Sequence, residues 1–285
     1  MNKPLSQSTI LVLLLAALAP SSALAQLQTL LDKEPQRVFA GEGRRITVVF
    51  HNPQGSAVDA DLHTRLYQSS SATALPLGDV PWKKLQVLPG QTVLESATMT
   101  FPSVKAETRF LVKWLEGTNK VAGMTEVFVY PADLLKALKP LAGEEPLGVF
   151  DPQNQLKPLL KAVAVECQDL ADTGLEDYHG KLAIVGPFQS KAQVPEETGD
   201  RIKKIARKGV AVVWIQPPPT ARDRLQPSFY AVPENTNAVV VVQPALVSGL
   251  PDNPQAQLDL IYFCKMALAP EPLRLPNPTI NHTEP

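Results

Sequence analysis

The stretch from Gly180 to Pro219, GKLAIVGPFQSKAQVPEETGDRIKKIARKGVAVVWIQPPP, holds two short apolar runs on either side of a helical pattern. The runs at 182–185 and 210–215 are nearly unbroken, as expected for strands that helices cover on both faces. Between them, Pro195 and two glutamates suit a helix start, and Arg207-Lys208-Gly209 suits its end. The stretch therefore predicts a strand, helix, strand crossover and a mostly parallel sheet in the second half of the chain.

The residues around this crossover extend the prediction to an α/β domain over 146–270. Further strands are expected at 147–150, 163–167 and 238–242. Asn253 and Pro254 suit the start of a last helix that reaches about Leu268 and is apolar nearly all round. Residues 132–145 are expected to form a linker, 217–237 a long loop, and the proline-rich residues 271–285 a loose tail.

The residues before the linker follow a different pattern. Short segments between 36 and 130 alternate apolar and polar residues and are separated by turn signals such as Pro89-Gly90 and Gly117-Thr118-Asn119. About seven such strands without a helix are typical of an antiparallel sandwich. This pattern resembles the immunoglobulin-like sandwiches of many exported bacterial proteins. The predicted fold is therefore multidomain, with an all-β immunoglobulin-like sandwich at 26–131 and a three-layer α/β domain after the linker.

The N-terminus has the features of a secretory signal peptide over residues 1–25. Lys3 precedes the apolar run Ile10–Ala19, and Ala23-Leu24-Ala25 is a small-residue cleavage site. No later stretch approaches the ~20 apolar residues that a membrane-spanning helix needs. We therefore expect a periplasmic or secreted protein without a transmembrane segment in the mature chain.

The composition excludes several kinds of site. The chain has 27 basic and 28 acidic residues, which argues against the concentrated basic face that nucleic-acid binding needs. The two cysteines, Cys167 and Cys264, lack a CxxC spacing. They either pair in an oxidising compartment or remain two buried thiols. Metal-binding, phosphate-loop and dinucleotide patterns are absent from the sequence, so we expect no metal and no cofactor.

The order of the α/β elements resembles the class I glutamine amidotransferase-like fold, above all in AIVGP at 183–187 and GVAVVWIQ at 209–216. In that family the second of these strands ends in the nucleophilic cysteine. Here Gln216 occupies that position, and the following Pro217 has no N–H to donate to an oxyanion. The family's His and Glu are replaced by Gln243-Pro244-Ala245. The resemblance therefore implies a retained fold without acyl-transfer chemistry.

The candidate site lies where the parallel strands end, since ligands bind there in open sheets. Asp151, Ser190, Trp214 and Gln216 fall at these positions. Three of these residues have an alternative that involves no ligand. Asp151 before Pro152 suits a helix N-cap, Ser190 lacks a GxSxG motif and suits an ordinary loop, and Trp214 suits the core.

Trp82 is a candidate binding residue in the sandwich. It follows Pro81 and precedes two lysines, a polar setting that suggests exposure and a platform for a sugar ring or a partner. The alternative is that Trp82 is tucked into the edge between the two sheets.

These observations favour an exported, non-catalytic binding or adaptor protein of envelope or carbohydrate processes, with a protein or a carbohydrate as its partner. One alternative is an ester or glycoside hydrolase that uses Asp151 or Glu196 with Ser190. The other is a structural component that docks its sandwich onto an envelope complex.

Overall fold

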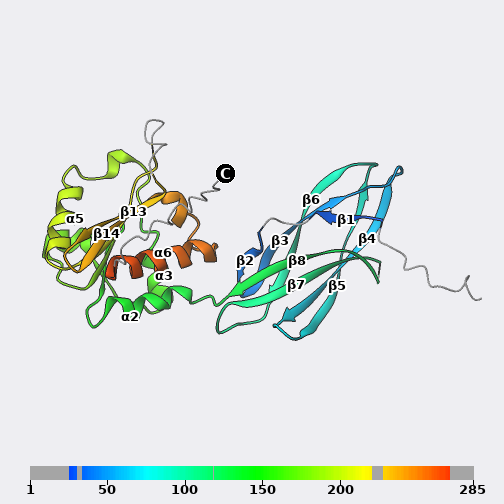
Figure 1. Ribbon diagram of the computed structural model, residues 1–285, viewed down its shortest axis with the longest axis horizontal. Helices are drawn as coiled ribbons and strands as arrows, with labels where there is room; N and C mark the ends of the chain where they lie inside the picture. The colour runs from blue at the N-terminus through cyan, green and yellow to red at the C-terminus, as the bar shows by residue number, and fades with distance from the viewer. Residues whose placement is uncertain (1–25, 31–33, 118, 220–226, 270–285) are drawn as a thin grey trace, which may run out of the picture. The chain divides into compact units, whose positions relative to one another are not determined.

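A computed structural model describes residues 26–30, 34–117, 119–219 and 227–269 (Figure 1). Contacts between residues group the chain into two compact units, of which the second includes everything from Val129 onward. The predicted signal peptide at 1–25 and the predicted tail at 271–285 lie outside the described residues. Within the described ranges, no helix is long and apolar enough to cross a membrane.

The first half of the chain forms two sheets. One has the order β1-β3-β6 and the other the order β2-β8-β7-β4-β5. Their pairs β1–β3, β4–β5 and β4–β7 are antiparallel, as the sequence predicts. The strands are β1 (Gln28–Leu30), β2 (Gln36–Phe39), β3 (Gly41–His51), β4 (Val58–Ser69), β5 (Ala74–Val87), β6 (Thr92–Phe101), β7 (Thr108–Glu116) and β8 (Lys120–Tyr130).

The core between these sheets follows from the period of two along a strand. In β3, Ile46, Val48 and Phe50 are buried while the residues between them are partly exposed. Phe50 meets Trp114 of the other sheet edge-on, with ring centroids 6.0 Å apart. The alternating pattern therefore places one face of each sheet against the other.

The second half contains a six-stranded mixed sheet of order β10-β9-β11-β12-β14-β13. β13 is antiparallel to β14, and the other neighbouring strands run parallel. The predicted mostly parallel sheet is thus present. Its strands are β9 (Leu147–Phe150), β10 (Cys167–Asp169), β11 (Leu182–Val185), β12 (Ala211–Ile215), β13 (Phe229–Glu234) and β14 (Asn237–Val242).

Two of these strands differ from the sequence prediction. β13 lies inside the stretch expected as a long loop, and β10 begins only at Cys167 instead of at Val163. Val163 completes the last turn of a helix, and Ala164 has a positive φ of 56°. That conformation ends the helix and leaves fewer residues for the strand.

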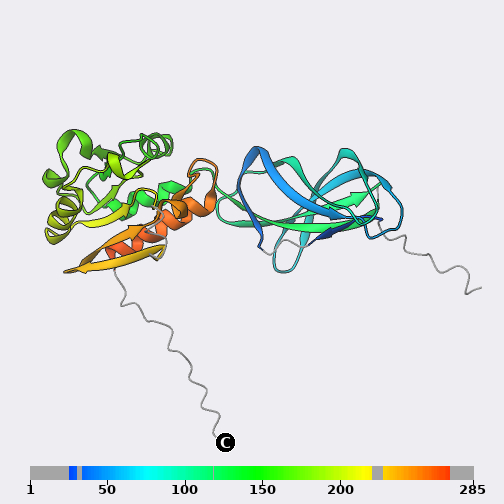
Figure 2. The same cartoon turned by 90° about the horizontal axis from the view of Figure 1, so that it is seen from above.

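Helices cover both faces of the sheet. Val213 and Val240 pack in a core with α3 and α6, whereas Val212 and Val239 pack in a second core with α5. Figure 2 shows α6 lying along β14 and β13. The helices are η2 (Leu134–Leu138), α2 (Lys139–Ala142), α3 (Lys157–Ala162), α4 (Leu170–Thr173), η3 (Leu175–Asp177), η4 (Lys191–Gln193), α5 (Thr198–Arg207), η5 (Pro244–Val247) and α6 (Pro254–Leu268).

The predicted linker at 132–145 is part of this packing. Leu135 and Leu138 of η2 are 1% and 0% exposed and belong to the same core as α6. The segment therefore adds apolar surface to the α/β core as well as connecting the two halves of the chain.

Candidate functional site

A cavity of about 440 Å³ lies at the carboxyl ends of β12 and β14. Two predicted residues, Trp214 and Gln216, line it together with Gln243, which follows β14. The remaining lining comes from the loop before α5, the start of α5 and the prolines after β12: Lys191, Val194, Pro195, Glu196, Gly199, Pro217, Pro218 and Pro219. The cavity is at the edge of the sheet where ligands of open parallel sheets bind.

Strand register explains why these side chains meet. Trp214 of β12 is the registered partner of Val241 in β14. Gln216 lies two residues after Trp214, and Gln243 lies two residues after Val241. Because side chains alternate along a strand, both glutamines lie on the same face as Trp214 and Val241. The Gln216 backbone N–H donates to the Val242 carbonyl at 2.9 Å, which keeps the two strand ends together beyond the last paired residues.

Trp214 has an unusual polar environment. Its Nε1–H is buried and has no hydrogen-bond partner among the described residues. The ring packs against the first turn of α5, since a Cβ added to Gly199 would lie 3.7 Å from it. A buried donor without a partner costs about 1–3 kcal/mol. An acceptor that reached this N–H would remove that cost.

Asp151 accepts hydrogen bonds from the start of a helix. It is 2% exposed, and its Oδ2 accepts hydrogen bonds from the backbone N–H groups of Leu156 (2.7 Å) and Lys157 (3.0 Å). These are the amides at the start of α3, whose N-cap residue is Leu156. Asp151 therefore accepts from the helix start from five residues upstream and is not itself the N-cap residue. Asp151 does not line the cavity, and its Oδ1 is buried without a described partner.

Ser190 lies in an exposed loop just before η4. Among the described contacts, its hydroxyl has no hydrogen bond to a histidine or a carboxylate. The same loop is held by Gln193, whose Oε1 accepts from Gln153 Nε2 at 2.8 Å and from the Gln189 N–H at 3.0 Å. Among the described residues, none is therefore placed to act as a base for this serine.

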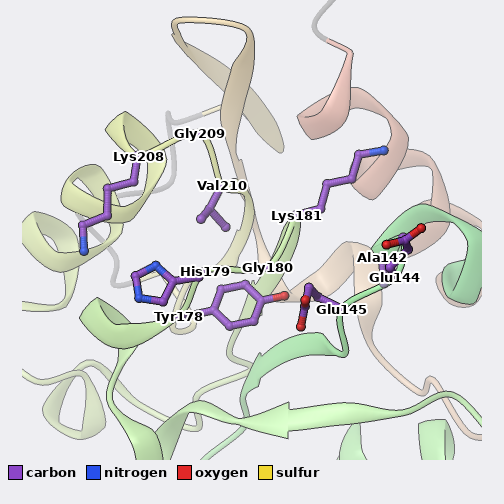
Figure 3. Close-up of a pocket in the computed structure, with 11 residues that line it drawn as sticks. Ala142, Glu144, Glu145, Tyr178, His179, Gly180, Lys181, Lys208, Gly209 and Val210 are labelled. Carbon is purple, nitrogen blue, oxygen red and sulfur yellow. The ribbon is translucent and has the colours of Figure 1, made fainter.

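A histidine lies at the edge of the sheet where the parallel strands begin, opposite to the edge that holds the cavity. His179 lines a second pocket, of about 340 Å³, near the amino ends of β9, β11 and β12 (Figure 3). The buried Tyr178 next to it accepts a hydrogen bond from the Gly148 N–H (2.9 Å), and its hydroxyl lies 2.8 Å from the Leu182 carbonyl. Burial raises the pKa of Tyr178. This phenol therefore links the amino ends of β9 and β11.

Trp82 is partly buried between the sheets. Its ring centroid lies 5.0 Å from that of Trp114 and 6.2 Å from that of Phe50. Lys83 Nζ sits over the Trp82 ring at 5.4 Å and forms an ion pair with Glu95 at 2.6 Å. Trp82 is thus packed against aromatic residues of both sheets and remains partly exposed.

The described part of the chain offers few groups for a metal site or for thiol chemistry. No cluster of three or more His, Cys, Asp or Glu there could hold a metal ion. Cys167 and Cys264 are free thiols, and burial raises the pKa of both. Neither thiol is activated as a thiolate, since activation requires a lowered pKa.

Comparisons with known proteins do not give a family. No family model matches the chain, and no curated protein matches it. Among solved structures, the Pseudomonas fluorescens alkylpurine DNA glycosylase AlkC bound to DNA containing an abasic site analog is 12% identical, with a TM-score of 0.30. A β-glucosidase from Listeria innocua in complex with glucose is 16% identical, with a TM-score of 0.26. The sporulation control protein Spo0M from Bacillus subtilis is 18% identical, with a TM-score of 0.27.

These matches are partial. They cover 37%, 36% and 42% of this chain and 31%, 16% and 56% of the respective solved chains. The chain thus spans less than two thirds of each of these proteins. Similarity at this level carries no argument about activity.

Proposed function

We propose that the chain is an exported, non-catalytic binding or adaptor protein, in which an immunoglobulin-like sandwich precedes an α/β unit of the class I glutamine amidotransferase-like fold. The strand order supports the fold proposed for the α/β unit. The absence of catalysis is supported by Gln216 and Pro217, which follow β12. Those are the positions where the amidotransferases need a cysteine and a backbone donor. Export rests on the sequence of residues 1–25.

The observation that carries the proposal is the chemistry of the cavity at the carboxyl edge. Its volume of about 440 Å³ falls within the ~300–1,000 Å³ of small-molecule sites. Its described lining contains an indole, two amides, several prolines, the exposed Lys191 and Glu196, and no cysteine, serine or histidine. Covalent catalysis needs a nucleophile next to a base. The lining therefore favours binding over turnover.

The hydrolase alternative has little support. Asp151 is buried and holds two backbone amides, and Ser190 has no base among the described residues. Glu196 does line the cavity but is exposed.

A docking role for the sandwich has one observation in its favour, the exposed Leu75 and Val80 of the edge strand β5. Pro76 and Pro81 lie in the same strand and remove backbone donors. Prolines on an edge strand oppose the addition of a further strand.

Thermal unfolding of residues 26–285 tests the proposal. The protein is heated with a panel of neutral oligosaccharides, nucleotides, amino acids and peptides. A ligand at a hundred times its Kd adds about 2.7 kcal/mol, or a few degrees in Tm. We expect one ligand class to raise Tm without being converted to product.

Gly199→Leu is the matched cavity variant. An added Cβ there meets only the Trp214 ring, so the longer side chain projects into the cavity. We expect Gly199→Leu to abolish the shift and Lys203→Leu, at an exposed position of the same helix, to retain it. A shift that survives Gly199→Leu, or a panel that gives no shift at all, would contradict the proposal.

A further inference from the structure

We infer that cleavage after residue 25 completes the sandwich, because the new α-ammonium group of Gln26 then forms an ion pair with the buried carboxylate of Glu116. The inference rests on the export part of the proposed function and goes beyond it, since it concerns what processing does to the fold. It comes from the juxtaposition of the Gln26 backbone nitrogen and Glu116 Oε2, which lie 2.6 Å apart.

Glu116 is a buried carboxylate without a basic partner among the described residues. It is the last residue of β7 and is only 9% exposed. Its Oε2 accepts hydrogen bonds from the backbone N–H groups of Gln26 (2.6 Å) and Leu27 (3.4 Å). None of the ion pairs between described side chains includes Glu116. Burial of an ionised carboxylate is costly, and a cation beside it offsets that cost.

The contact joins the two sheets of the sandwich. Leu27 is fully buried and directly precedes β1, which pairs with β3. Glu116 belongs to β7 of the other sheet. Further along β1, Thr29 lies so close to Gly123 of β8 that a Cβ added there would be 2.6 Å from the Thr29 Cβ. Burial and close packing thus hold the chain on which the Gln26 nitrogen depends for its position.

Cleavage changes the chemistry of this nitrogen. In the uncleaved chain it belongs to the peptide bond with Ala25 and offers one neutral N–H. Hydrolysis of that bond puts a hydroxyl on the Ala25 carbonyl carbon and leaves an amine, which is mainly protonated at pH 7. The neutral donor beside Glu116 becomes a cation, and a hydrogen bond between two charged groups is about twice as strong.

The position of the cleavage site matters for this pair. The small residues Ala23-Leu24-Ala25 place the predicted cleavage directly before Gln26. Cleavage one residue earlier or later would move the amine by about 3.8 Å along the chain. Only an amine on Gln26 itself coincides with the nitrogen that contacts Glu116. The structure therefore gives the predicted cleavage site a second role, as the source of a counter-charge.

Thermal unfolding of residues 26–285 in three N-terminal forms tests the inference. The first form has the free amine. In the second, the Gln26 amine has attacked its own side-chain amide carbon with loss of ammonia, so the nitrogen keeps an N–H but has no charge. The third carries one added glycine before Gln26. All forms contain Trp214→Phe, because the remaining tryptophans, Trp82 and Trp114, lie in the sandwich and their fluorescence then follows this unit alone.

We expect the free-amine form to unfold roughly 4–8 °C above the other two forms. Glu116→Gln removes the negative charge and should bring all three forms within about 2 °C of one another. Glu34→Gln is the matched control, since Glu34 is exposed and forms no ion pair with another described residue. This control should leave the difference between the forms unchanged. Mass analysis identifies the N-terminal form in each sample.

The outcomes separate this inference from the binding function. Equal midpoints for the free-amine and cyclised forms would overturn the ion pair, and so would a difference that Glu116→Gln leaves intact. N-terminal sequencing of the exported protein tests the link to processing. A first residue other than Gln26 overturns that link, and a chain that keeps residues 1–25 contradicts export as well. Ligand binding in the α/β unit is measured separately, so it can stand when the ion pair fails.

Discussion

Replacing Tyr178 with phenylalanine tests how the amino ends of β9 and β11 are held. The hydroxyl accepts from the Gly148 N–H at 2.9 Å and lies 2.8 Å from the carbonyl oxygens of both Pro146 and Leu182. Its single proton can serve one of these carbonyls at a time. The substitution keeps the ring, which packs so closely on Gly148 that an added Cβ there would lie 2.8 Å from it.

The expected loss follows from these contacts. The buried Gly148 N–H would be left without an acceptor, which costs about 1–3 kcal/mol. The lost bond from the hydroxyl to a carbonyl adds about 1 kcal/mol. Tyr178→Phe should therefore lower the free energy of unfolding by about 2–4 kcal/mol.

Urea unfolding followed by circular dichroism at the helical minimum measures this loss, since the described helices all follow β8. Tyr262→Phe is the control, because this exposed ring should lose less than about 0.5 kcal/mol. A Tyr178→Phe loss as small as that of the control would refute the bridging role of the hydroxyl. The two units can unfold separately, so the transition is fitted without assuming two states.

Two further perturbations probe packing and charge. Gly123→Ala should cost about 1–3 kcal/mol, since the new Cβ would lie 2.6 Å from the Thr29 Cβ and closer still to its hydroxyl; the thermal midpoint measures this, and an unchanged midpoint would contradict the close approach of β1 and β8. The Lys157 ammonium, 2.5 Å from Asp169, lowers the pKa of that carboxyl below its usual 3.8. The stabilisation of the folded state by this ion pair is present above pH ~4 and is lost as the pH falls through the lowered pKa of Asp169. Asp169→Asn should thus cost up to about 1 kcal/mol at pH 7 and almost nothing near pH 2 in urea titrations; an equal cost at both would contradict the ion pair.

The sequence predicts the centre of the α/β sheet well because its signal is local. The apolar runs at β11 and β12 are buried on both faces of the sheet. Successive residues such as Val212 and Val213 lie in the two cores on opposite faces. β13 lacks such a run. Its segment contains Pro233 and has no fully buried residue, and it becomes a strand through pairing with β14. Long-range pairing of this kind leaves little local trace.

Part of the candidate site could also be predicted from the sequence. Trp214 and Gln216 follow from the rule that sites form at the carboxyl ends of parallel strands, and the same rule would have led to Gln243.

The packing of Trp82 also depends on register. A bulge in the β4–β5 pair leaves this residue without a direct partner, and a bulge changes the direction in which a side chain points. The polar neighbours of Trp82 in the sequence therefore say little about its exposure.

The most direct measurement is a calorimetric titration of residues 26–285 and of the Gly199→Leu variant with the ligand that the thermal panel identifies, followed by mass analysis of that ligand. We expect saturable binding by the unmodified chain, no binding by the variant, and a chemically unchanged ligand. Equal binding by both proteins would place the site elsewhere, and a converted ligand would show that the chain is an enzyme.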